Sequence, residues 1–157
     1  MIGTLVLGIG NTIMSDDGIG VRVVRELATR FRFPPSVSIL DGGTLGLDLL
    51  PHLEGIANLL IIDAVMTPDP PGTLIRLEGE EIPRVFATKL SPHQMGLQDL
   101  LAVSTLMGHT PASMVLLGAV PVELGMGTEL SPPLQQSVEP LVAMALHELE
   151  RFGVTPI

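Results

Sequence analysis

Cysteine is absent from this chain of 157 residues. Its absence excludes disulfides, thiolate nucleophiles and every metal or cluster site that needs thiolate ligands. Any metal must therefore be held by carboxylates and imidazoles. A chain without disulfides also fits a reducing compartment, and we expect a cytoplasmic protein.

Positive charge is scarce as well. Eight Lys and Arg stand against 17 Asp and Glu, which gives a formal net charge of −9, and the pI is near 4.7. Nucleic acids and anionic membrane surfaces are bound by clustered cations, so we expect neither as a partner. Charged residues make up only 16% of the chain, which excludes intrinsic disorder and a coiled coil.

Long apolar runs are missing, although 46% of the residues are hydrophobic and the mean hydropathy is +0.49. No stretch approaches the roughly 20 residues that a membrane-spanning helix needs. The N-terminus lacks the basic region of a signal peptide and reads as a strand. The length fits a single domain over residues 1–157, and we expect a monomer.

The sequence contains instead a regular alternation of short apolar runs and amphipathic segments. The runs predict strands, and apolar residues spaced by three and four predict helices. Strands are expected at 5–9, 37–40, 59–62, 72–77 and 114–120, and long helices at 19–31, 91–106 and 134–152. This alternation predicts a three-layer α/β/α fold with a five-stranded, mostly parallel sheet. The strand at 72–77 follows its predecessor too closely for a helical crossover, which predicts one antiparallel strand.

Two local features carry expectations of their own. Thr44 follows the second strand and is expected to cap a short helix that carries Leu45, Leu49 and Leu50. Pro140 lies inside the periodic pattern of the last helix, where a proline lacks the N–H that the helix needs. We therefore expect a kink or a break at this position.

Acidic side chains follow the first three predicted strands. Asp16 and Asp17 come after the first strand, Asp41 after the second and Asp63 after the third, while His93 lies at the start of a later helix. In parallel sheets the ligand site lies beyond the carboxyl ends of the strands. Carboxylates that share a cleft repel each other unless a cation or a proton intervenes. Carboxylates with a neutral imidazole suit a divalent transition metal.

Each of these residues also has a purely structural interpretation. Asp16 and Asp17 precede a helix, where acidic side chains cap the helix and interact with its dipole. Asp41 precedes Gly-Gly-Thr and suits a turn, and His93 suits the first turn of a helix. Asp63 is harder to explain in this way, because a carboxylate at the end of a buried apolar strand carries a desolvation cost.

Motifs of several common enzyme classes are absent. The segment Gly8-Ile9-Gly10-Asn11 begins like a dinucleotide-binding fingerprint, but Ile13 occupies the position of the third glycine. There is no Walker A sequence and no Gly-x-Ser-x-Gly elbow. Covalent acyl catalysis therefore has no evident nucleophile.

Five sequence blocks resemble, in order and spacing, the nickel–iron hydrogenase maturation endopeptidases. The blocks are LGIGN at 7–11 running into SDDGIGV at 15–21, LDGGT at 40–44, IDA at 62–64, PGT at 71–73 and KLSPHQMGL at 89–97. Each block alone is weak, but five in register are specific. The resemblance covers residues 5 to about 120, and the remainder fits more loosely.

The resemblance implies an enzyme that removes a C-terminal extension from a hydrogenase large-subunit precursor after nickel insertion. It implies metal ligation by Asp17, Asp63 and His93, with the Asp-Gly-Gly loop at Asp41 near the same cleft, and a mixed five-stranded sheet. Our hypothesis is that the three ligands engage nickel already seated in the precursor. The nickel would serve as recognition element and as Lewis acid. Asp41 or Asp16 would accept a proton or position the substrate.

Several further expectations and alternatives follow. A three-ligand site without thiolate should hold free nickel weakly, so the isolated protein should be largely metal-free. The Pro- and Gly-rich loops at 67–72 and 122–133 are expected to decide which precursor is processed. Three other functions are open at this point: a signalling receiver domain, a non-catalytic nickel-binding checkpoint protein, and a self-contained zinc hydrolase of small peptides.

Overall fold

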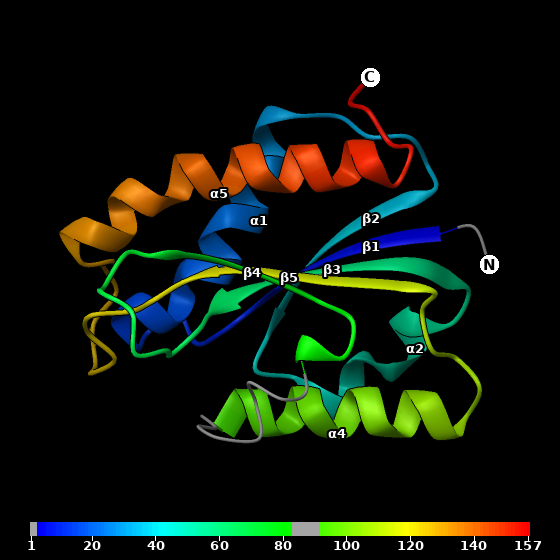
Figure 1. Cartoon of the computed structure of the whole chain (residues 1–157), viewed down its shortest axis with the longest axis horizontal. Coiled ribbons are helices and arrows are strands. Elements are labelled where there is room, and N and C mark those ends of the chain that lie inside the picture. The colour runs from blue at the N-terminus through cyan, green and yellow to red at the C-terminus, as the bar shows by residue number, and fades with distance from the viewer. Residues whose placement is uncertain (1–2, 83–91) are drawn as a thin grey trace.

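A five-stranded mixed sheet forms the centre of the protein (Figure 1). The computed structural model describes residues 3–82 and 92–157, and of residues 46 and 92–98 it describes the backbone only. The strands are β1 (Gly3–Ile9), β2 (Val37–Gly43), β3 (Ile56–Ala64), β4 (Leu74–Glu78) and β5 (Ser113–Ala119). Their spatial order is β2-β1-β3-β5-β4, with four parallel strands and β4 antiparallel to β5. The predicted sheet is confirmed.

Helices cover both faces of the sheet. On one face lie α1 (Ile19–Arg30) and α5 (Pro132–Arg151), and on the other lie α2 (Leu50–Leu53) and α4 (Pro92–Leu106) (Figure 1). Two short 3-10 helices, η1 (Ser15–Gly18) and η2 (Gly46–Leu49), follow β1 and β2. The predicted three-layer arrangement is therefore confirmed. No helix within 3–82 or 92–157 is long and apolar enough to cross a membrane.

The apolar runs of the strands supply both layers of the core. Along β3, Leu60 and Ile62 pack toward α1 and α5, whereas Leu59 and Ile61 pack toward the face of α2 and α4. All four side chains are fully buried. Successive residues of a strand point to opposite faces, so a strand covered on both sides reads as one continuous apolar run.

The strand order excludes the receiver-domain alternative. Receiver domains have the parallel order 2-1-3-4-5. Here β5 lies between β3 and β4, and β4 is antiparallel. The short connection at residues 65–73 contains no helix that would carry the chain across the sheet to a parallel strand.

One local prediction was wrong, and of the kink or break expected at Pro140 the break does not occur. The N-cap of η2 is Leu45, no side chain caps it, and Leu45 is exposed, so Thr44 does not have the predicted role. The helix α5 continues through Pro140 without a break. Pro140 lies on the exposed side of α5, where water can hydrate the carbonyl that lost its donor.

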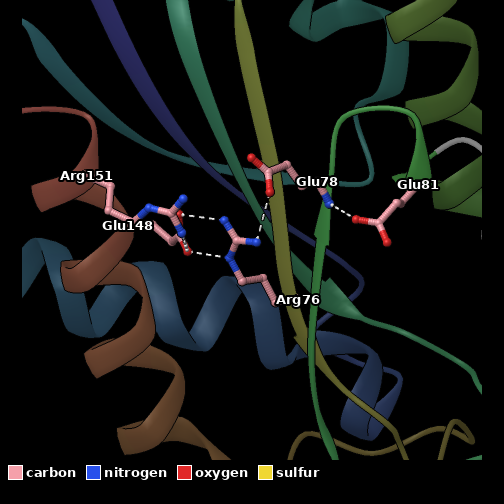
Figure 2. Close-up of polar contacts among 5 residues, drawn as sticks. All are labelled: Arg76, Glu78, Glu81, Glu148 and Arg151. Carbon is pink, nitrogen blue, oxygen red and sulfur yellow. Dashed lines mark hydrogen bonds and ion pairs between the residues drawn. The ribbon is translucent and has the colours of Figure 1, made fainter.

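Glu148 is a buried carboxylate on the inner side of α5, which the apolar pattern of this helix does not reveal (Figure 2). Arg76 of β4 donates to it twice, from Nε to Oε1 at 2.5 Å and from Nη2 to Oε2 at 3.3 Å. Arg151 Nη1 lies 3.6 Å from the same Oε1. The hydrogen bonds to Glu148 raise the pKa of Arg76 above its usual value. This ion pair ties the edge strand β4 to α5.

Replacing Arg76 by methionine is expected to destabilise the fold by about 2–3 kcal/mol, because it leaves the Glu148 carboxylate buried with Arg151 as its remaining ion-pair partner among the described residues. For a protein of this size the loss corresponds to roughly 5–10 °C in Tm, measured by thermal unfolding. The matched control is Arg30→Met, whose partner Glu139 is exposed. If both variants lower the Tm by the same amount, the buried ion pair contributes no more to stability than the exposed one.

Candidate functional site

The carboxyl ends of β1, β2, β3 and β5 lie at one edge of the sheet, as their parallel pairing requires. We call this the carboxyl edge. The loops that follow these strands meet there, and the loop between β5 and α5 lies beside the chain that follows β1 (Figure 1). Ligand sites of such sheets form at this edge.

Asp63 is the penultimate residue of β3 and is fully buried. Its Oδ1 accepts a hydrogen bond from the N–H of Ala64 at 2.8 Å. On the adjacent strand β5 its partner is Gly118, where a Cβ would overlap the backbone oxygen of Asp63. Glycine at position 118 thus allows β5 to pair closely with β3 beside Asp63. The predicted carboxylate at the end of a buried strand is present.

Asp17 lies in η1 and is also buried. Its Oδ2 accepts a hydrogen bond from the N–H of Asn11 at 2.9 Å. The glycines around it explain how η1 reaches the strand ends. Gly10 has φ +134°, and a Cβ there would overlap the backbone oxygen of Asp17, while a Cβ on Gly20 would overlap the carbonyl oxygens of Ile9 and Ile62.

These contacts place Asp17 and Asp63 on neighbouring elements, because η1 packs against β3. Both carboxylates are held by backbone N–H donors and are shielded from solvent. Hard oxygen donors in a shielded position are suited to a divalent cation. The arrangement is therefore chemically suited to the predicted metal-engaging site.

His93 lies in the first turn of α4, but its side chain is outside the described residues. Ser91, the first residue of the helix predicted at 91–106, is outside the described residues too. In the part of the chain that is described, no group of three or more His, Asp or Glu side chains is placed to hold a metal ion. The three-ligand set Asp17, Asp63 and His93 therefore stays a prediction.

Asp41 has the contacts of a turn residue. Its Oδ1 accepts the N–H of Gly43 at 3.1 Å, and its Oδ2 lies 3.2 Å from Nη2 of Arg25 on α1. The side chain is exposed, and Gly43 has φ +49°. These contacts match the turn interpretation of the sequence, and a catalytic role of Asp41 stays a prediction.

Asp16 is a buried carboxylate that organises a distant loop. Its Oδ2 accepts hydrogen bonds from the N–H of Val122 at 2.8 Å, the N–H of Glu123 at 2.9 Å and the Oγ–H of Ser131 at 2.8 Å. Its Oδ1 accepts the N–H of Ser131 at 2.7 Å. We call these four residues the Asp16 cluster. No side chain caps α1, so Asp16 is not the predicted helix cap.

The pKa of Asp16 reflects two opposing effects. Burial by itself raises the pKa, but the hydrogen bonds from Glu123, Ser131 and Val122 outweigh burial and leave the pKa below its usual value. Asp16 therefore stays ionised and accepts hydrogen bonds only. The sequence alone could not reveal this role, because every partner lies more than 100 residues further along the chain.

Solved structures of known proteins share this fold. The hydrogenase maturating endopeptidase HybD from E. coli superposes with a TM-score of 0.95 at 39% identity, covering 99% of this chain and 96% of that chain. The [NiFe] hydrogenase maturation protease HybD from Thermococcus kodakarensis gives a TM-score of 0.79 at 31% identity, covering 94% and 98%. The fold is thus that of the hydrogenase-maturing endopeptidases.

Relatives by sequence point to the same class. The hydrogenase 2 maturation protease of Escherichia coli strain K12 is 40% identical over 154 residues, which cover 98% of this chain and 94% of the relative. The hydrogenase expression/formation protein HupD of Rhodobacter capsulatus is 43% identical over 152 residues, which cover 96% and 72%. The family model for hydrogenase maturation proteases matches residues 21–148. The chain belongs to the hydrogenase maturation protease family, as its sequence blocks predicted, and is an endopeptidase of hydrogenase maturation.

Proposed function

We propose that this endopeptidase removes the C-terminal extension of a nickel–iron hydrogenase large-subunit precursor after nickel insertion, and that it recognises the nickel already seated there. The observation that carries the proposal is the pair of buried carboxylates, Asp17 and Asp63, at the carboxyl edge of a protease of this family. A buried carboxylate is costly unless a hydrogen-bond network, a proton or a cation compensates it.

The donor set supports a metal that arrives with the substrate. Asp17 and Asp63 supply oxygen donors, and His93, in the first turn of α4, would supply a neutral imidazole, since the positive end of a helix dipole disfavours imidazolium. No cysteine is available to complete a tight site. Three such ligands with open positions hold a free ion weakly, yet they add to an ion that the precursor already coordinates.

The roles of the individual residues follow from this proposal. Asp17 and Asp63 are held in place by backbone hydrogen bonds and would bind the nickel together with His93. When bound, the nickel supplies a Lewis acid near the scissile bond. Asp41, at the exposed end of β2, would position the substrate or accept a proton.

The test is a processing assay read by mass spectrometry. Purified protein is mixed with a large-subunit precursor prepared with nickel or without it. We expect the C-terminal peptide to be released from the nickel-loaded precursor only, at a rate at least about a hundredfold higher than from the nickel-free precursor. Mutating the residues that orient metal ligands typically costs roughly 10–100-fold in activity, so loss of the metal itself should cost at least as much.

The other outcomes separate the alternatives. Equal cleavage of both precursors would contradict nickel recognition while leaving the endopeptidase in place. Nickel-dependent binding without cleavage would favour the checkpoint protein. Cleavage of small unrelated peptides with added zinc would favour the self-contained zinc hydrolase.

A further inference from the structure

Large apolar side chains are exposed at the carboxyl edge, around the Asp16 cluster, to which one of them, Val122, belongs. Four of them lie on two segments, and we call them the apolar surface: Ile13, Val122, Leu124 and Met126. Met126 is 85% exposed and Ile13 is 54% exposed. Single exposed apolar residues are common, but several at one edge indicate an interaction surface.

The two segments that carry these side chains are joined by their backbones. Met14 and Gly127 form a parallel bridge, in which Gly127 N–H donates to the carbonyl of Ile13 and Ser15 N–H donates to the carbonyl of Gly127, both at 2.9 Å. Ile13 and Met126 each come one residue before the bridged pair, so they are neighbours across it. The exposed side chains of Ile13 and Met126 therefore lie on adjacent backbone segments.

The backbone of Met126 is held on both sides. The carbonyl of Gly125 accepts the Oγ–H of Ser15 at 2.8 Å, and Gly127 is fixed by the bridge. Ser15 itself has φ +52°, a left-handed conformation that non-glycine residues rarely adopt. Such backbone strain persists where the surrounding structure fixes it, and it is concentrated at functional sites. The backbone that carries the exposed Met126 is therefore held in place.

We propose that the apolar surface binds an apolar segment of the hydrogenase precursor during processing. This inference rests on the proposed function, since Ile13 lies four residues before Asp17 and Val122 is anchored by Asp16, next to Asp17. The apolar surface therefore adjoins the carboxyl edge. Residues 10–18 and 121–131 contain acidic side chains but no Lys or Arg, so an apolar segment without negative charge fits best.

The test compares polar substitutions of similar shape at two places. Met126→Gln and Ile13→Thr, alone and together, change the apolar surface. The matched controls are Met107→Gln and Ile157→Thr, at positions 55% and 84% exposed and away from the carboxyl edge. All four residues are exposed, so thermal unfolding should show unchanged stability. Binding of the nickel-loaded precursor is measured by biolayer interferometry, and KM and kcat are measured in the processing assay.

We expect the double variant to raise both the Kd for the precursor and KM roughly tenfold or more, with kcat nearly unchanged and the controls like wild type. Unchanged Kd and KM in the double variant, with cleavage by wild type, would overturn the docking proposal and leave the proposed function intact. If the double variant binds the precursor more weakly but the wild type does not cleave it, the result would support the docking proposal and contradict the proposed proteolysis. Loss of self-association instead of precursor binding would assign the surface to a second copy of the chain and overturn the proposal.

Discussion

Replacing Asp63 with asparagine is expected to abolish processing, lowering kcat/KM by more than about a hundredfold, since even outer partners of metal ligands typically contribute 10–100-fold. Asparagine has the shape of aspartate and keeps an oxygen that accepts the N–H of Ala64. It removes the negative charge with which a divalent cation interacts. The fold should therefore survive while the chemistry is lost.

The measurement is the rate of peptide release from nickel-loaded precursor, together with the Tm of each variant. Asp99→Asn is the matched control, because Asp99 is exposed on α4 and lies outside the loops at 67–72 and 122–133. We expect Asp99→Asn to process like wild type. An Asp63→Asn protein that cleaves within a few-fold of wild type would show that Asp63 is structural.

Replacing Asp16 with asparagine is expected to lower both stability and substrate affinity. The amide places an N–H₂ group where one carboxylate oxygen now accepts a hydrogen bond, so it must oppose a donor of Val122, Glu123 or Ser131. Hydrogen bonds to charged groups contribute about 1.5–3 kcal/mol each in net terms, so we expect a loss of roughly 2–4 kcal/mol. The apolar surface would lose its anchor, and KM should rise.

The acid dependence of stability tests the same residue. The folded-state pKa of Asp16 is depressed, so its contribution is present above the unfolded pKa of about 3.9 and is lost as the pH falls through the lower folded value. The difference in unfolding free energy between wild type and Asp16→Asn should be largest near neutral pH. It should shrink below about pH 4. Asp48→Asn, at an exposed position in η2, is the control. A difference that does not change with pH would contradict an ionised Asp16 in the fold.

The sheet could be predicted because its signals are local. Strands buried on both faces read as unbroken apolar runs, and helices covering them show a periodicity near 3.6. The antiparallel direction of β4 could be predicted because the chain between β3 and β4 is too short for a helical crossover. The buried position of Asp63 could be predicted because the residue ends an unbroken apolar run, whereas its role in the site stays a prediction.

Other features depend on contacts between distant residues, which one sequence does not show. Asp16 reaches Ser131 across 115 residues, and Arg76 reaches Glu148 across 72. The structural roles of the two acids could not be predicted, because Asp16 is adjacent to the predicted metal ligand Asp17 and Glu148 lies within an apolar helix face. The predicted helix cap at Thr44 was wrong, because threonine is able to cap a helix but does not do so at every helix start.

The central claim is that the carboxyl edge engages the nickel of the precursor. X-ray absorption at the nickel edge tests it directly, on nickel-loaded precursor frozen alone and shortly after mixing with this protein, before processing. We predict that wild type adds oxygen and nitrogen donors to the nickel and that Asp63→Asn adds fewer. An unchanged nickel spectrum in a mixture that goes on to release the C-terminal peptide would contradict the account.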